Sequence, residues 1–269
     1  MASRVYSNGE EEEFAEADAI LAELRARADR GESDLPWGDC LDRTWDEHGV
    51  LHVTREYDIG TAGGEGARLV LREMPYSAHP TAVGGTGGVV WAGALALAAQ
   101  LQDEPALRAR LARSGPQRVV EIGAGCGLPG LVAAALACPD TSILLTDESE
   151  PVLENLRFNV AKNAELLAGR CVDVARLVWE EALEGTAETP NADVLLGSDV
   201  IWGERGLLVG QLARRMVQPG GLLVLSAQEG REGLEDFAKV LCSDGPGPPF
   251  DVDVRAIGDS MELPRALWR

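Results

Sequence analysis

The chain has 269 residues, of which 45% are hydrophobic and 25% charged, a composition typical of a globular protein with a full hydrophobic core. Its 44 acidic residues exceed its 24 lysines and arginines, so the formal net charge is −20. An acidic surface repels polyanions, which argues against nucleic acid or an anionic membrane as a partner. The same charge favours a protein partner with a basic docking surface.

The sequence contains no recognisable membrane span or targeting segment. Its longest apolar stretch, 89–101, is shorter than the roughly 18 residues that cross a bilayer. The polar, acidic start of the chain differs from a signal or transit peptide. Five cysteines without a CxxC pair are typical of reduced thiols. We expect a cytoplasmic protein, with the nucleus as a further location, and we expect a monomer.

Residues 1–86 are expected to form an extension of the main domain. Apolar residues at helical spacing among acidic ones predict a helix over about 10–30, either a substrate-recruiting element or a solvated face. Residues 31–49 have the composition of a loop. Two alternating segments around a glycine-rich turn, 51–57 and 68–72, predict a β-hairpin.

Residues 87–269 are expected to form the second and larger domain. Strands and helices alternate in it, which predicts an α/β, doubly wound, mostly parallel sheet with helices on both faces. The expected strands are 118–122, 142–146, 170–174, 193–197, 221–227 and 250–256. The expected helices are 90–102, 128–137, 150–164, 205–217 and 231–242.

A glycine cluster at 123–130 follows the first of these strands and precedes a helix. Glycines at such a turn let a ligand approach the backbone, and the helix start offers unpaired N–H groups. The motif alone fits a nicotinamide dinucleotide equally well. Glu121 favours S-adenosylmethionine, because its carboxylate can hold the cationic amino-acid end of that cofactor directly or through water. Asp147 ends the next strand and is placed to accept hydrogen bonds from a ribose, although it could instead cap the next helix.

Five motifs in order resemble the seven-β-strand methyltransferases of family 16, the protein-lysine methyltransferase group. They lie at 88–91, 120–127, 145–160, 177–179 and 197–202. The last motif resembles the Asp-x-x-Tyr signature that this family carries after its fourth strand, at the mouth of the target-lysine channel. The resemblance implies a class I, Rossmann-like fold with an antiparallel member in the final strand pair, and transfer of a methyl group from S-adenosylmethionine to a protein lysine.

The resemblance also implies which residues bind the cofactor. Trp91 lines the pocket, Asp147 holds the ribose, Trp179 packs on the adenine and Ser198 contacts the cofactor through its backbone. Together with Glu121, the implied cofactor residues are Trp91, Gly123, Ala124, Gly125, Asp147, Trp179 and Ser198.

Asp199 and Trp202 are the catalytic candidates. Asp199 can orient the incoming amine through a hydrogen bond. Trp202 replaces the tyrosine of the family signature, so it lacks the hydroxyl but keeps an aromatic face that can hold a cation. No histidine stands among the core motifs as a general base.

The sequence is also compatible with two other functions. A small-molecule N-methyltransferase would use the same cofactor site with a closed acceptor pocket. A non-catalytic, cofactor-binding interaction protein would explain the replacement of tyrosine by Trp202 as a loss of activity. A nicotinamide-dependent reductase is disfavoured by Glu121.

Overall fold

The structure is a computed structural model, and it describes residues 39–47, 50–64, 66–74, 85–243, 250–256 and 265–268. The acidic helix predicted over 10–30 lies outside the described residues. Within them, no helix is long and apolar enough to cross a membrane.

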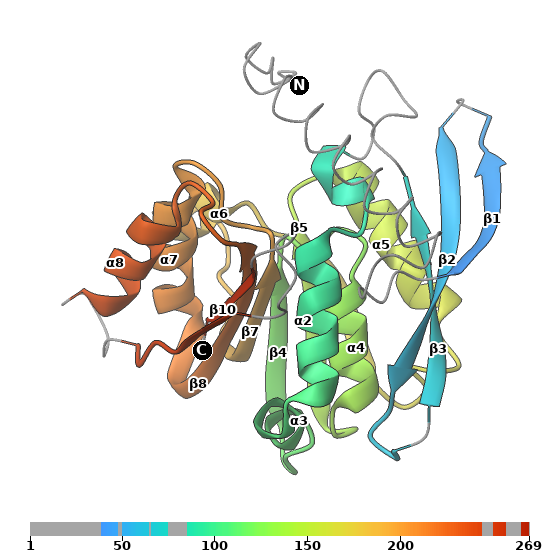
Figure 1. Ribbon diagram of the computed structural model, residues 1–269, viewed down its shortest axis with the longest axis horizontal. Coiled ribbons are helices and arrows are strands. Elements are labelled where there is room, and N and C mark those ends of the chain that lie inside the picture. Colours follow the sequence, from blue (N-terminus) through green and yellow to red (C-terminus); the bar gives the residue numbers. More distant parts are fainter. Residues whose placement is uncertain are drawn as a thin grey trace.

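A seven-stranded sheet with the order β6-β5-β4-β7-β8-β10-β9 forms the centre of the molecule (Figure 1). Strands β4 to β8 are parallel, whereas β10 is antiparallel to both β8 and β9. Because β5 and β7 flank β4, the strand order reverses at β4, and a crevice is expected at the carboxyl ends of β4 and β7. The strands are β4 (Gln117–Ile122), β5 (Thr141–Asp147), β6 (Cys171–Arg176), β7 (Ala192–Ser198), β8 (Val217–Gln228), β9 (Val254–Ala256) and β10 (Arg265–Trp268).

Helices cover both faces of this sheet, because successive strand residues point to opposite sides. Val119 of β4 packs into the cluster that includes α2 and α4, whereas Val120 and Ile122 pack into the cluster that includes α6, α7 and α8. The helices are α2 (Ala92–Asp103), α3 (Pro105–Leu111), α4 (Leu128–Leu136), α5 (Glu150–Lys162), α6 (Trp179–Glu184), α7 (Arg205–Met216) and α8 (Leu234–Cys242), with the 3-10 turn η2 (Gly85–Gly88) ahead of α2.

The predicted doubly wound, mostly parallel sheet is confirmed, as is its antiparallel final pair. Each strand predicted after residue 117 is present, although the last covers only Val254–Ala256. The sequence did not predict the short helices α3 and α6.

A second, three-stranded antiparallel sheet lies beside the main one at the β6 and α5 end of the molecule (Figure 1). The predicted hairpin is confirmed as β2 (Leu51–Gly60) and β3 (Gly66–Glu73). The expected loop over 31–49 is wrong in part, because Asp39–Trp45 forms strand β1 on the edge of β2. All seven residues of β1 are exposed, so no buried face imposed an alternating pattern that could reveal the strand.

Two asparagines of α5, Asn155 and Asn159, and its C-cap Asn163 join this sheet to the main sheet. They are four residues apart, so they share one face of the helix. Asn163 pairs with both the N–H and the C=O of Val70, at 2.8 and 2.7 Å. Asn159 does the same with Arg72 at 2.8 and 3.2 Å, while Asn155 contacts the Arg72 side chain and carbonyl. The amides therefore satisfy the edge of β3 as a neighbouring strand would.

Candidate active site

The turn after β4 presents backbone rather than side chains to the crevice. Gly123, Gly125 and Gly127 all have positive φ, at 58°, 55° and 85°. At Gly125 the requirement is also steric, because a Cβ there would lie 3.0 Å from the carbonyl oxygen of Gly87. The turn can therefore admit a ligand close to its peptide groups.

Asp147 connects this turn to the loop after β5. Its Oδ2 accepts a hydrogen bond from the Gly125 N–H at 3.1 Å, and its Oδ1 accepts one from the Ser149 N–H at 3.2 Å. Burial raises the pKa of Asp147 although these backbone donors act to lower it. A carboxylate has about four acceptor positions, so Asp147 can still accept a hydrogen bond from a ribose hydroxyl. Asp147 also steadies the start of α5, whose N-cap is Ser149.

The segment before α2 lies against the same turn. The Cys126 thiol donates to the Gly87 carbonyl at 3.7 Å. Trp91, the half-buried N-cap of α2, donates from its indole Nε1 to the Thr86 carbonyl at 2.7 Å. This bond ties the Trp91 ring to η2, the turn whose Gly87 accepts from Cys126.

Glu121 lies beneath the turn and is fully buried. Its Oε2 accepts a hydrogen bond from the Gly130 N–H in the first turn of α4 at 3.0 Å. Burial, followed by the nearby charge of Asp147, raises the pKa of Glu121 to about 8. The carboxyl group presents no surface to a ligand here, so it supports the turn from below instead of lining the open site.

Three further cofactor candidates surround the turn. A Cβ on Gly123 would lie 3.5 Å from the Trp179 ring, so this tryptophan, at the start of α6, packs directly on the turn. The Ala124 N–H donates to the Thr146 carbonyl at 2.8 Å, which anchors the turn to β5. Ser198 is half-buried at the carboxyl end of β7.

Asp199 follows β7 and holds the first turn of α2. Its Oδ2 accepts from the Gly93 N–H at 2.8 Å, and its own N–H donates to the Ser226 carbonyl at 2.9 Å. Ser226 Oγ in turn donates to the Gly93 carbonyl at 2.8 Å. Asp199 has φ 51°, a strained conformation for a residue with a side chain and one that concentrates at functional sites.

Trp202 is half-buried and shares its surroundings with a cation that the sequence reasoning missed. The Arg205 guanidinium carbon lies 4.9 Å from the centre of the Trp202 ring and 5.1 Å from that of the Trp179 ring. Arg205 also contacts Glu148, the neighbour of Asp147, at 3.4 Å. The only sequence signal for Arg205 was a basic residue at the start of a helix, three positions after Trp202.

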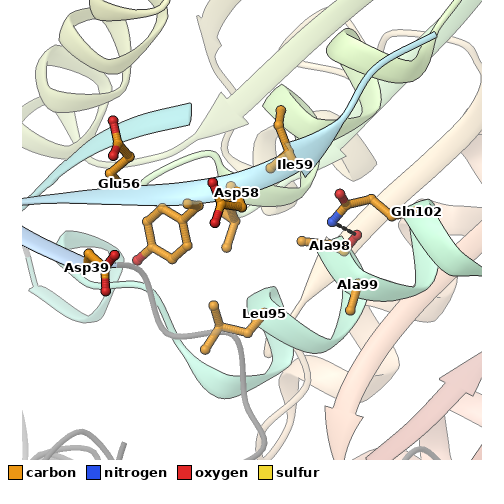
Figure 2. Close-up of a pocket in the computed structure, with 10 residues that line it drawn as sticks. Asp39, Glu56, Asp58, Ile59, Leu95, Ala98, Ala99 and Gln102 are labelled. Atoms are coloured by element: carbon orange, nitrogen blue, oxygen red, sulfur yellow. Dashed lines mark hydrogen bonds between the residues drawn. The ribbon is translucent and has the colours of Figure 1, made fainter. Parts of the chain in front are cut away.

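One groove in the described part of the chain lies away from this constellation, between β2 and α2 (Figure 2). Its volume is about 180 Å³. Apolar groups of α2 such as Leu95 and Ala98 line it together with Tyr57 and with carboxylates that include Asp39 and Asp58. It contains none of the residues expected to bind the cofactor or the acceptor.

The fold and the site together are those of a class I, S-adenosylmethionine-dependent methyltransferase. A sequence model described as "Lysine methyltransferase" matches residues 74–243, more than half of the chain. The chain therefore belongs to the lysine methyltransferase family, and S-adenosylmethionine is its cofactor.

Curated relatives match about half of the chain. Protein N-lysine methyltransferase METTL21A of Danio rerio is 35% identical over 45% of this chain and 50% of its own length. Protein-lysine N-methyltransferase EEF2KMT of Mus musculus is 34% identical over 44% of this chain and 36% of its own length. Histone-arginine methyltransferase METTL23 of Xenopus laevis is 33% identical over 55% of this chain and 64% of its own length. The chain thus spans less than two thirds of these relatives.

Solved structures of methyltransferases resemble the chain at low identity. Fibrillarin of Aeropyrum pernix, with natively bound S-adenosyl-L-methionine, superimposes with a TM-score of 0.48 at 12% identity, over 86% of this chain and 100% of that one. Precorrin-6y C5,15-methyltransferase of Geobacter metallireducens gives a TM-score of 0.46 at 19% identity, over 63% of this chain and 89% of that one.

The residues present fit the cofactor. The turn has positive φ at Gly123 and Gly125, and neither residue places a Cβ between its peptide groups and a ligand. Asp147 would hold the ribose, and the Trp179 ring would pack against the adenine. Trp91 would close the site from the α2 side.

Proposed function

We propose that this protein transfers a methyl group from S-adenosylmethionine to the ε-amine of a lysine in another protein. The observation that carries the proposal is the contact of the β7 loop with the cofactor turn. A Cβ on Gly123 would lie 2.8 Å from Val200 Cγ1, so the segment with Asp199 and Trp202 rests directly on the turn. The names of the relatives from Danio rerio and Mus musculus support lysine as the acceptor.

The bound cofactor supplies a methyl group already activated by a sulfonium charge. The protein then needs only to align a neutral nucleophile and to exclude water. A lysine has an ordinary pKa of about 10.4, so it must lose a proton before it attacks. An acceptor channel that excludes water favours the loss of this proton, because burial disfavours an ammonium ion.

Asp199 and Trp202 contact different parts of the acceptor side chain. The Asp199 carboxylate accepts a hydrogen bond from the amine and fixes the direction of its lone pair. Its backbone bond to Ser226 and its contact with Gly93 prevent it from swinging away. Trp202 contacts the alkyl stem and, after transfer, the cationic product, a contact worth about 0.5–2 kcal/mol.

An arginine is the second candidate acceptor. The supporting observation is the relative from Xenopus laevis, whose name describes a histone-arginine methyltransferase and which matches 55% of this chain. The same carboxylate and aromatic face could receive a guanidinium group. The two acceptors differ in the methylated amino acid that they yield.

The proposed partner is a protein with a basic docking surface, and the acceptor protein is cytoplasmic or nuclear. The support is the formal charge of −20, which attracts cationic surfaces and repels nucleic acid. We also propose that the enzyme acts as a monomer.

A transfer assay tests the function. The purified protein is incubated with methyl-labelled S-adenosylmethionine and a cell lysate, with Asp147→Ala as the cofactor-deficient control. The proposal expects a labelled protein band that the control lacks. Label in small molecules alone would indicate a small-molecule N-methyltransferase, and binding without any transfer would indicate a non-catalytic cofactor-binding protein.

A further inference from the structure

Arg205 lies where three loops of the site meet. It is the first residue of α7, and its backbone N–H donates to the Trp202 carbonyl at 3.1 Å, which folds the chain back on itself. Its guanidinium faces both Trp202 and Trp179, and only 18% of its side chain is exposed. Its Nη2 contacts Glu148 Oε1 at 3.4 Å. Arg205 thus touches the segments that follow β5, β6 and β7.

Local preferences do not explain this placement. A cation at the start of a helix faces the positive end of the helix dipole, which is unfavourable. The ion pair with Glu148 is long and partly exposed, and such pairs contribute little to stability. The two ring contacts are the remaining interactions, and both involve tryptophans already assigned to the site on other grounds.

We propose that Arg205 is a positioning residue that couples the cofactor half of the site to the acceptor half. The guanidinium holds the Trp179 ring on the cofactor side and the Trp202 ring at the acceptor mouth, so a displacement of one ring is transmitted to the other. The acceptor half of this inference rests on the proposed function, whereas the cofactor half does not.

The planar guanidinium is suited to this role in a way that an ammonium is not. Two aromatic faces and a carboxylate can be contacted at once by a flat group with five donors, whereas lysine presents a compact point charge. Arg205→Lys should therefore recover only part of what Arg205→Met loses. If Arg205 contributed only its positive charge, Arg205→Lys would recover the whole of the loss.

A double-mutant cycle on cofactor affinity tests the coupling without any acceptor. Calorimetry would measure S-adenosylmethionine binding to the wild type, Arg205→Met, Trp202→Leu and the double variant, each corrected for its folded fraction. We expect each single change to weaken binding roughly 3- to 10-fold, as expected for loss of a ring–cation contact. The double variant should bind the cofactor no more weakly than Arg205→Met, because Arg205→Met already removes the guanidinium that links the Trp202 ring to the Trp179 ring. Arg157→Met removes an exposed arginine that pairs with Glu150 at 2.7 Å, and it should bind as the wild type does.

Steady-state kinetics on the acceptor supplies the second readout. Arg205→Met should lower kcat and raise the acceptor KM, and Arg205→Lys should restore both in part. Additive effects in the cycle, or an Arg205→Met variant with unchanged cofactor affinity, would overturn the inference. A wild type that binds the cofactor but methylates no lysine would instead overturn the proposed function, and the binding cycle would still decide the role of Arg205.

Discussion

The carboxylate of Asp199 accepts a hydrogen bond at 2.8 Å from the backbone N–H of Gly93, a residue 106 positions earlier in the chain. The bond joins the carboxyl end of β7 to the first turn of α2, and Trp91 is the N-cap of that helix. One side chain therefore fixes the acceptor loop and one wall of the cofactor site relative to each other. It also gives Asp199 a structural role beside its proposed catalytic one.

Replacement of Asp199 separates these two roles. The Asn side-chain oxygen can still accept from Gly93, so Asp199→Asn should change the free energy of unfolding by less than about 1 kcal/mol. The lost charge should lower kcat about 30- to 1000-fold, because it acts mainly in the transition state, while cofactor affinity stays nearly constant. Asp199→Ala should lose the turnover and also about 1–2 kcal/mol of stability, as for a deleted helix cap.

The measurement is kcat per folded molecule together with denaturant unfolding on the same preparations. Asp140→Asn, a change at an exposed aspartate, serves as the control and should resemble the wild type in both. An Asp199→Asn protein with full turnover would place the catalytic carboxylate elsewhere.

Asp147→Ala should weaken S-adenosylmethionine binding by about 1.5–3 kcal/mol, because the ribose hydroxyls lose a charged acceptor and the turn loses its tie at Gly125. That is roughly a 10- to 150-fold rise in Kd by calorimetry. Asp173→Ala, at an exposed site on the neighbouring strand β6, should bind the cofactor normally. A folded Asp147→Ala protein with unchanged affinity would refute the ribose assignment.

Glu121 should make stability depend on pH. Its pKa is raised by burial to about 8, so the folded protein retains a proton that the unfolded chain, with an ordinary value near 4.5, releases. The free energy of unfolding should therefore fall as the pH rises from about 4.5 to about 8, by at most about 1.4 kcal/mol per pH unit from this group. Glu121→Gln cannot ionise, and its amide oxygen can still accept from Gly130, so its stability should decline less steeply.

Unfolding in denaturant at pH 6 and pH 8 would compare the two proteins, with Glu165→Gln as an exposed control that keeps the wild-type dependence. Equal slopes in Glu121→Gln and the wild type would show that Glu121 is already ionised in the folded protein.

The glycine turn and the strand and helix that flank it were largely predictable from the sequence, because local rules determine them. A β-branched strand that ends in a glycine cluster predicts β4, the turn after it and α4. The apolar segment before Asp147 predicts the next strand and its end in the same way. These residues lie within about one βαβ unit, so short-range pattern was enough. Glu121 was recognised as special, but its depth beneath the turn depends on how α4 packs over it.

The contacts across the molecule were not predictable, because they join residues far apart in sequence. The pairing of Asp199 with Gly93 and the meeting of Arg205 with Trp179 follow from the topology of the sheet. Strand β1 was missed because three of its seven residues are charged and a bulge interrupts its register between Cys40 and Asp42. Helix α6 is only six residues long, too short for a periodic signal.

Asn159 should be the critical residue of the α5 face that holds β3. Asn159 is fully buried, and its side chain accepts from the backbone N–H of Arg72 and donates to the backbone carbonyl of Arg72. It also donates to the Cys126 carbonyl in the glycine turn at 3.0 Å. Asn159→Leu would remove the acceptor of the Arg72 N–H and the donor to the Cys126 carbonyl, whereas the Arg72 carbonyl keeps its bond from Asn155. The change should cost about 2–4 kcal/mol of unfolding free energy. Amide exchange at Arg72 should accelerate as well. Asn191→Leu, at an exposed site, should stay within about 0.5 kcal/mol of the wild type, and equal stabilities of the two variants would refute the role of Asn159.

Identification of the methylated amino acid tests the central claim most directly. The labelled protein from the transfer assay would be hydrolysed and its amino acids separated, with Asp199→Asn run in parallel. We predict that the label is recovered as ε-N-methylated lysine and falls about 30- to 1000-fold with Asp199→Asn. Label recovered as methylarginine, or label on lysine that is undiminished in the Asp199→Asn reaction, would contradict the account.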